Sequence, residues 1–184
     1  FPATTGLPSK AGTGWTAPRI RITGAAPAFS KGTKPVCSRG GVREPAILSW
    51  PAAIKGGRVN DEVAAMMDIA PTFLDLAGAD LTEEPYASRF DGISLKGLLL
   101  NDEPSPHQRI FWEYKNQLAV REGAWKLVLN GMLDNRREAP DPVHLADLSQ
   151  DPGERVNLAA QYPDIVERLS REVKAWYAEV TGQA

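Results

Sequence analysis

The sequence predicts a mixed α/β segment over residues 40–105, followed by a small α+β unit over residues 106–184 that combines an antiparallel sheet with a C-terminal helix. Two patterns carry this prediction. Apolar residues recur at helical spacing over residues 61–78, and the second half holds several segments rich in β-forming residues, separated by short polar breaks. Residues 1–39 show neither pattern, so we expect an irregular leader there.

In the first half, the apolar run within Val42–Trp50 is followed by a proline, which predicts a buried strand. Helical spacing then runs from Asp61 to Gly78 with Pro71 in its middle, which predicts two helical pieces. We expect Asp68 to cap the second piece and Gly78 to end it. The strands are too few to complete a doubly wound sheet, so the sequence predicts a fragment of a larger domain.

Ser94 is expected to cap a short helix that follows a polar loop. The segments 109–114, 118–121 and 125–129 then predict an antiparallel meander, with a fourth strand over residues 143–148. A closing helix should begin near Pro163 and cover one face of this sheet. Its predicted buried stripe, with Trp176 as the main anchor, consists of Ile165, Leu169, Val173, Trp176 and Val180.

Charge and cysteine content limit the partners and the chemistry. The net charge is −2, yet residues 1–43 contain no acidic residue. A basic leader of this kind can recruit polyanions, but no aromatic residues are interleaved with the basic ones and no recognition helix follows, so we expect no nucleic-acid partner. No apolar stretch is long enough to predict a membrane span. The single cysteine, Cys37, excludes an intrachain disulfide and a multi-cysteine zinc site.

The sequence holds no self-sufficient catalytic set. His107 and His144 lack the neighbours of a catalytic triad or a metal site and are interpreted as ordinary surface or strand-end histidines. Cys37 has no recognisable partner base, so we expect an inert thiol. The tryptophans of the second half, Trp112, Trp125 and Trp176, are expected to pack in the core rather than to form a sugar platform.

Six short motifs nevertheless occur together, in one order and spacing. They are Gly40-Gly-Val-Arg-Glu-Pro45, Trp50-Pro51, Asp68-Ile-Ala-Pro-Thr-Phe-Leu-Asp-Leu-Ala-Gly78, Asp91-Gly-Ile-Ser-Leu95, Val120-Arg-Glu-Gly-Ala-Trp-Lys-Leu127 and Asp147-Leu-Ser-Gln-Asp-Pro-Gly-Glu-Arg-Val-Asn-Leu158. In this respect residues 40–180 resemble the C-terminal part of an arylsulfatase-type sulfatase of the alkaline phosphatase-like superfamily. Each motif also reads as helix capping or turn formation, so the six identify scaffold rather than catalytic residues.

The resemblance implies hydrolysis of a sulfate monoester, with a formylglycine made from Cys or Ser, a calcium ion and basic residues around the sulfate. Neither the nucleophile motif nor the acidic metal motifs can be read in this chain. Lys34 stands six residues before Gly40, where similar sulfatases place a lysine that contacts sulfate. Arg39 and the pair Cys37-Ser38 depart from the family pattern around it.

Several alternatives remain open at this level. A reading-frame shift would explain why residues 1–39 depart from the family and lack acidic residues. The leading hypothesis is a sulfuric ester hydrolase fragment, inactive alone, that lacks the N-terminal part of the catalytic domain and whose family acts on sulfated small molecules or glycans. A phosphodiesterase or phosphonate hydrolase of the same superfamily and a carbohydrate-binding remnant are the alternatives. Similar proteins are commonly periplasmic or secreted.

Overall fold

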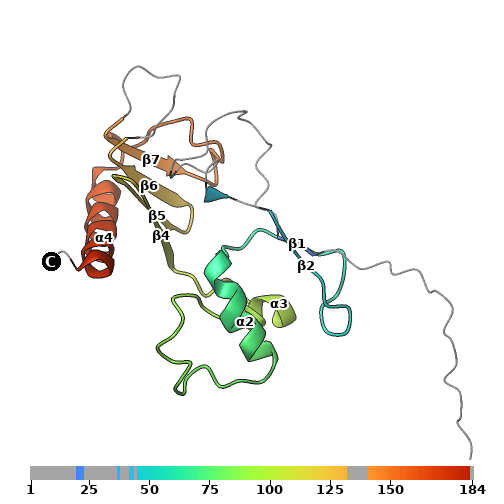
Figure 1. Cartoon of the computed structure of the whole chain (residues 1–184). Helices are drawn as coiled ribbons and strands as arrows, with labels where there is room; N and C mark the ends of the chain where they lie inside the picture. Colours follow the sequence, from blue (N-terminus) through green and yellow to red (C-terminus); the bar gives the residue numbers. More distant parts are fainter. Residues whose placement is uncertain (1–19, 23–36, 38–41, 44, 132–140, 183–184) are drawn as a thin grey trace, which may run out of the picture.

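The computed structural model describes residues 20–22, 37, 42–43, 45–131 and 141–182. These residues form two groups of elements (Figure 1). The first group combines three short strands with two helices and a 3-10 turn. The second group is a four-stranded sheet covered by one long helix. The order of elements along the chain matches the predicted α/β segment followed by a small α+β unit.

The first group contains a small sheet with the strand order β2-β1-β3. Strand β1 (Ile20–Ile22) pairs antiparallel with β2 (Ala46–Leu48) and parallel with β3 (Val59–Asn60). The prediction of an irregular leader is therefore wrong at residues 20–22, and most of its remainder lies outside the described residues. The predicted burial of β2 is also wrong, because Ile47 is 63% exposed on a three-residue strand with one neighbour.

The predicted pair of helical pieces is confirmed as the 3-10 turn η1 (Met66–Asp68) and helix α2 (Ile69–Leu76). Pro71 lies in the first turn of α2. Backbone N–H groups have no intrahelical acceptor in this turn, so the lack of an N–H in proline costs no hydrogen bond. Gly78 follows the helix with φ +89°, a left-handed conformation that favours glycine. Asp68 immediately precedes α2, as expected. Its side chain, however, accepts no hydrogen bond from the backbone N–H groups of that helix and accepts instead from Ile93 N.

Helix α3 (Lys96–Asn101) follows, and its buried Leu98 and Leu99 pack with Ile54. The prediction that Ser94 caps this helix is wrong by one position, because Leu95 is the N-cap residue and makes no side-chain capping hydrogen bond. The hydroxyl of Ser94, one residue earlier, accepts a hydrogen bond from the backbone N–H of Lys96 at 3.2 Å.

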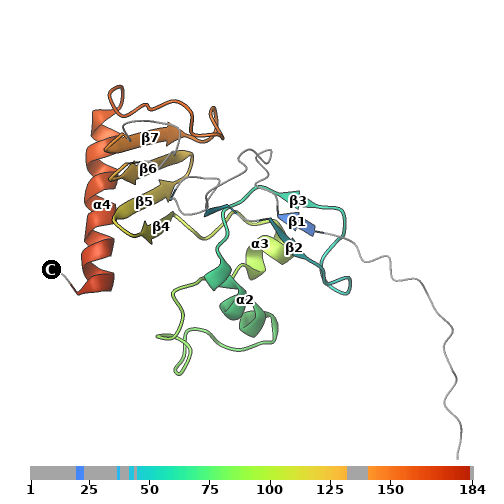
Figure 2. The ribbon, with the colours of Figure 1, turned by 45° about the horizontal axis from the view of Figure 1, so that its top comes forward.

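The second group is the predicted meander. Strands β4 (Arg109–Tyr114), β5 (Gln117–Glu122), β6 (Trp125–Leu129) and β7 (Val143–Asp147) pair antiparallel in sequence order. Helix α4 (Pro163–Thr181) runs across one face of all four strands (Figure 2). The long loop between β6 and β7 includes residues 132–140, which lie outside the described part of the chain.

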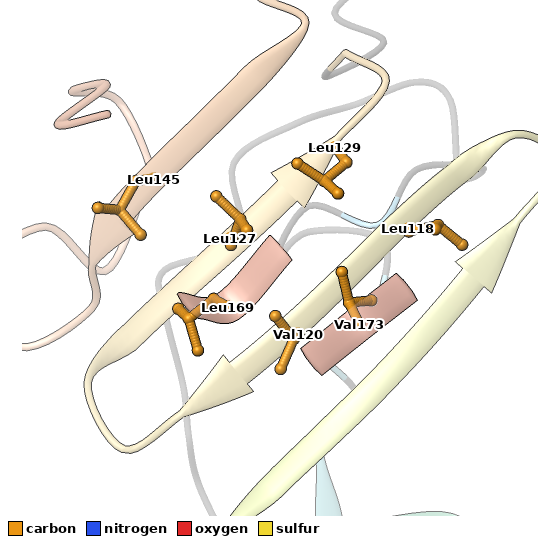
Figure 3. Packing of buried hydrophobic residues seen from close by; sticks show 7 residues of the cluster. All are labelled: Leu118, Val120, Leu127, Leu129, Leu145, Leu169 and Val173. Carbon is orange, nitrogen blue, oxygen red and sulfur yellow. The ribbon is translucent and has the colours of Figure 1, made fainter. Parts of the chain in front are cut away.

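Side chains alternate between the two faces of this sheet, and the face toward α4 is apolar. One row crosses all four strands in register and consists of Phe111, Val120, Leu127 and Leu145. Leu169 and Val173 of α4 are fully buried against this apolar face of the sheet (Figure 3). Trp176 stacks on the ring of Phe111 with the centroids 5.2 Å apart. The predicted stripe ends there, because Val180 lies in the last turn and is 59% exposed.

In the described part of the chain, no helix combines the length and the apolar character that a membrane crossing requires.

Candidate functional site

Lys34, the residue expected to contact sulfate, lies outside the described residues. The nearest described residue is Cys37, which is buried on the face of the sheet opposite α4, called here the outer face. It packs there with Ala119 of β5 and Val128 of β6. Its backbone N–H donates to Oε1 of Gln117 at 3.2 Å. Gln117, 80 positions away in the sequence, thus holds the backbone of Cys37.

Burial raises the pKa of the Cys37 thiol, and the nearby positive charge of Lys126 only partly opposes that effect. A thiol with a raised pKa is mostly protonated at neutral pH and is a poor nucleophile. This supports the interpretation of Cys37 as an inert thiol.

Lys126 and Glu154 form a buried ion pair on the same outer face. Their side chains are each 2% exposed, and Nζ of Lys126 lies 2.9 Å from Oε1 of Glu154. The ammonium also lies 5.5 Å from the ring centre of Trp112, within cation–π range. Burial lowers the pKa of Lys126, and the carboxylate of Glu154 opposes this shift. The pair joins two of the six sequence motifs, those of residues 120–127 and 147–158.

The turn that carries Glu154 is built by two side chains of its own motif. The carboxylate of Asp151 accepts hydrogen bonds from three backbone N–H groups, those of Gly153, Arg155 and Val156, at 2.5–3.2 Å. Asn157 accepts from Leu145 N at 3.1 Å, which ties the turn to β7, and from Ala159 N at 3.0 Å. The turn is therefore preformed around the ion pair.

Asp68 is the centre of the second polar cluster. Its carboxylate is fully buried and accepts from Ala65 N at 2.6 Å, from Ile93 N at 3.0 Å and from Nε2 of His107 at 2.7 Å. Because an ionised carboxylate only accepts, Nε2 of His107 carries the proton in this contact. Asp68 therefore joins three segments that are distant in the sequence.

Two further contacts join the motifs of residues 68–78 and 91–95. Leu95 N donates to the hydroxyl of Thr72 at 2.9 Å, and this hydroxyl donates to the carbonyl of Asp68 at 2.5 Å. Gly92 lies so close to the chain before α2 that a Cβ there would sit 2.1 Å from the carbonyl oxygen of Met67. Only glycine fits this approach, which explains the Asp-Gly turn physically.

The interpretation of His107 as a surface or strand-end residue is wrong. Its side chain is 4% exposed, and it lies in the link between the two groups of elements. Ser105 reinforces the same link: its N–H donates to Glu62 Oε2 at 3.0 Å and its hydroxyl donates to Val63 O at 2.5 Å. Sequence reasoning missed this contact because 39 residues separate Asp68 from His107.

His144 also differs from the interpretation, because it is buried within β7 at 2% exposure, with Nδ1 3.5 Å from Oδ2 of Asp141. Across the described ranges, no three or more His, Cys, Asp or Glu side chains are grouped to hold a metal ion. The described residues therefore do not fit the calcium ion implied by the resemblance, and no catalytic step can be derived through it. Both polar clusters are structural: they join the sequence motifs to one another.

The scaffold matches a known protein family. The family described as N-sulphoglucosamine sulphohydrolase, C-terminal, matches residues 34–179. Arylsulfatase A of Bos taurus is 34% identical over 155 residues, and steryl-sulfatase of Mus musculus is 32% identical over 163 residues. These alignments cover 73% and 75% of this chain but only 30% and 26% of the relatives.

Solved structures agree. A Bacteroides thetaiotaomicron protein connected with the metabolism of multiple glycosaminoglycans superposes with a TM-score of 0.59 at 25% identity, covering 74% of this chain and 29% of that one. Ps i-CgsB in complex with k-i-k-neocarrahexaose gives a TM-score of 0.60 at 23% identity, covering 79% and 32%, which shows the shared fold. The chain belongs to the sulfatase family, with the alkaline phosphatase-like α/β fold, and corresponds to its C-terminal portion.

Proposed function

We propose that the chain is the C-terminal portion of a sulfuric ester hydrolase that cleaves sulfate monoesters, and that it is inactive alone. The family match over residues 34–179 carries this proposal. The chain spans about 30% of the length of the arylsulfatases that it matches. The described residues supply two structural clusters and no grouped metal ligands.

Lys34 is the residue of this chain that we assign to the sulfate. The family match begins at residue 34 and so includes it. A lysine ammonium would neutralise sulfate oxygens and the negative charge that builds on the leaving oxygen. The formylglycine nucleophile and the calcium ion would be supplied by residues outside this chain. In the assembled enzyme, Lys34→Met should lower kcat/KM for an aryl sulfate by about 100-fold or more.

The substrate is a sulfated small molecule or a sulfated glycan. Relatives named for aryl and steryl sulfates support the first class, and the structural neighbour connected with glycosaminoglycan metabolism supports the second. A separate glycan-binding role is less well supported, because Trp176 is engaged by Phe111. We assign residues 40–105 to the catalytic domain and residues 106–184 to a C-terminal subdomain, with residues 1–39 as a leader.

The partner of this chain is the N-terminal part of a sulfatase catalytic domain. Apolar side chains three and seven residues apart form an exposed row on η1 and α2. Met66 is 78% exposed, Ile69 44% and Phe73 56%. A monomeric domain rarely leaves such a row uncovered, and the portion of the relatives beyond this match offers the missing cover.

The test compares the chain alone with the chain joined to the sulfatase sequence encoded upstream of it. We expect no hydrolysis of 4-nitrophenyl sulfate by the isolated chain, with or without calcium, and turnover by the joined protein. A joined protein that cleaves bis(4-nitrophenyl) phosphate faster than the sulfate would replace the proposal by phosphodiester hydrolysis. Turnover by the isolated chain that a substitution within it abolishes would overturn the assignment as an inactive portion.

A further inference from the structure

We propose that one face of the three-stranded sheet β2-β1-β3 is a docking surface for an α-helix from the N-terminal part of the catalytic domain. This face, called here the open face, carries Ile47 of β2 and Val59 of β3. It is a different surface from the exposed row on η1 and α2. The inference rests on the proposed function in one respect, that the chain is a portion of a larger catalytic domain.

Strand pairing places Ile47 and Val59 on the same face of the sheet. Both are backbone partners of Arg21 in β1, Ile47 in the antiparallel pair and Val59 in the parallel pair. Residues paired directly across neighbouring strands point to the same side of a sheet. The two side chains therefore stand in one row, on either side of β1 and about 10 Å apart.

The opposite face of this sheet is already covered by a helix. Leu48 follows Ile47 in β2 and points to that face, because side chains alternate along a strand. It packs against a buried cluster that contains Ile54 together with Leu98 and Leu99 of α3. The sheet thus has α3 on one side, and the open face lies on the other.

The open face leaves its apolar side chains in water. Ile47 is 63% exposed and Val59 is 61% exposed. Sheets of the α/β class bury both faces, usually under helices. This chain has the fold of that class but spans only about 30% of the length of the arylsulfatases that it matches. A helix from the remaining length is the cover that the open face lacks.

The size of the open face favours such a helix over a second copy of the chain. Strands of three residues make a sheet about 10 Å long and about 14 Å wide. One helix, about 10–12 Å wide with its side chains, covers that width. The area of about 140 Å² is far below the roughly 800 Å² per partner of a stable dimer. A helix of the same joined protein needs no such area, because covalent linkage gives it a high effective concentration.

Carbene labelling tests the proposal directly. A photolysed diazirine modifies exposed side chains, and peptide mass spectrometry compares the complete 184-residue chain with the joined protein. Labelling at Ile47 and Val59 should fall about fivefold or more in the joined protein, because close packing excludes the reagent. Val180, which is 59% exposed on α4, should keep its labelling. Unchanged labelling at Ile47 or Val59, or an equal fall at Val180, would overturn the proposal.

Ile47→Lys adds an independent test. In the isolated chain the lysine would stand in water, so the urea midpoint should match that of the wild type. In the joined protein it would place a charge beneath the helix, and the midpoint should fall by about 1 M or more, or the protein should fail to fold. Ile47→Val keeps an apolar surface and should be tolerated in both. An effect of Ile47→Lys in the isolated chain as large as in the joined protein, or no effect in either, would refute the docking surface.

Sedimentation of the isolated chain tests the alternative occupant. A dimer that protects Ile47 and Val59 from the carbene would assign the open face to a second copy and overturn the proposal. None of these measurements depends on hydrolysis. A joined protein that is protected at both residues but cleaves no sulfate ester would refute the proposed function and leave the docking surface in place. Cleavage without protection would refute the docking surface alone.

Discussion

At the scale of single residues, buried charges hold the motifs of this chain together. Lys126 and Glu154 face each other at 2.9 Å without access to water, and Glu154 has φ +53°, a left-handed conformation uncommon for a non-glycine residue. That conformation costs about 1 kcal/mol. The turn keeps it because it brings the carboxylate to the lysine. The pair thus selects one geometry of the turn.

A double-variant cycle tests this pair. Glu154→Gln removes the negative charge and leaves a buried ammonium, so we expect a loss of about 3 kcal/mol in the free energy of unfolding. Lys126→Met together with Glu154→Gln should recover at least half of that loss, because no charge is then buried alone. Urea unfolding followed by tryptophan fluorescence gives both values. A double variant less stable than both single variants would contradict this account.

At the scale of elements, helix α4 is held to the sheet by two kinds of contact. Its apolar stripe packs on the sheet through Leu169 and Val173. Beside the stripe, Glu122 at the end of β5 accepts from Arg168 of α4 at 2.5 Å and from Arg109 of β4 at 2.7 Å. The ionic contacts lie at the rim of the apolar contact, where water is partly excluded.

Trp176→Ala tests the apolar contact. Trp176 stacks on Phe111 at 5.2 Å, so truncation should cost about 3 kcal/mol in the free energy of unfolding. The urea midpoint of the complete chain reports this loss, and Val180→Ala, at the exposed end of the same helix, serves as the control with little change. An unchanged midpoint for Trp176→Ala together with weaker binding to a glycan array would favour a sugar-binding role.

The ionic contact predicts a pH dependence. Arg168, followed by Arg109, holds the pKa of Glu122 below its ordinary value of 4.5. The folded protein therefore loses this proton more readily than the unfolded chain does. The resulting stabilisation is fully present above pH 4.5 and disappears as the pH falls through the lower pKa of the folded state.

Glu122→Gln should be less stable than the wild type by about 1 kcal/mol at pH 7, since all three side chains are partly exposed. The difference should shrink as the pH falls below 4.5 and vanish once the pH lies below the lowered pKa of Glu122 in the folded state. Chemical denaturation at several pH values checks this, and a difference that does not shrink at any acid pH at which both proteins still fold would exclude the ionic origin.

At the scale of the whole molecule, regular patterns in the sequence predicted more than single residues did. The meander and α4 were predictable because alternation and helical spacing report directly on two-faced elements. The exposure of β2 was not predictable, because three apolar residues in a row do not show whether another element covers them. The Asp68–His107 and Lys126–Glu154 pairs were not predictable either, because contacts across 39 and 28 residues leave no local pattern.

The two groups of elements are coupled through hydrogen bonds of the link between them. The cluster around Asp68 ties the link before β4 to the chain before α2, through His107 and Ser105. His107→Ala leaves the buried carboxylate of Asp68 with two backbone donors and removes the His107 contact of the link, while the contacts of Ser105 remain. We therefore expect the urea transitions of the two groups to separate, with residues 45–105 losing hydrogen-exchange protection before β4–β7 and α4 do.

His107→Gln is the matched variant, because its amide can still donate to Asp68 and should preserve more of the coupling than alanine does. Hydrogen exchange followed by mass spectrometry at increasing urea resolves the two groups in one experiment. If residues 45–105 and the four-stranded sheet lose protection at the same urea concentration in His107→Ala, the coupling does not depend on this pair. The hydrogen bonds of Ser105 with Glu62 and Val63 would then be the contacts to test next.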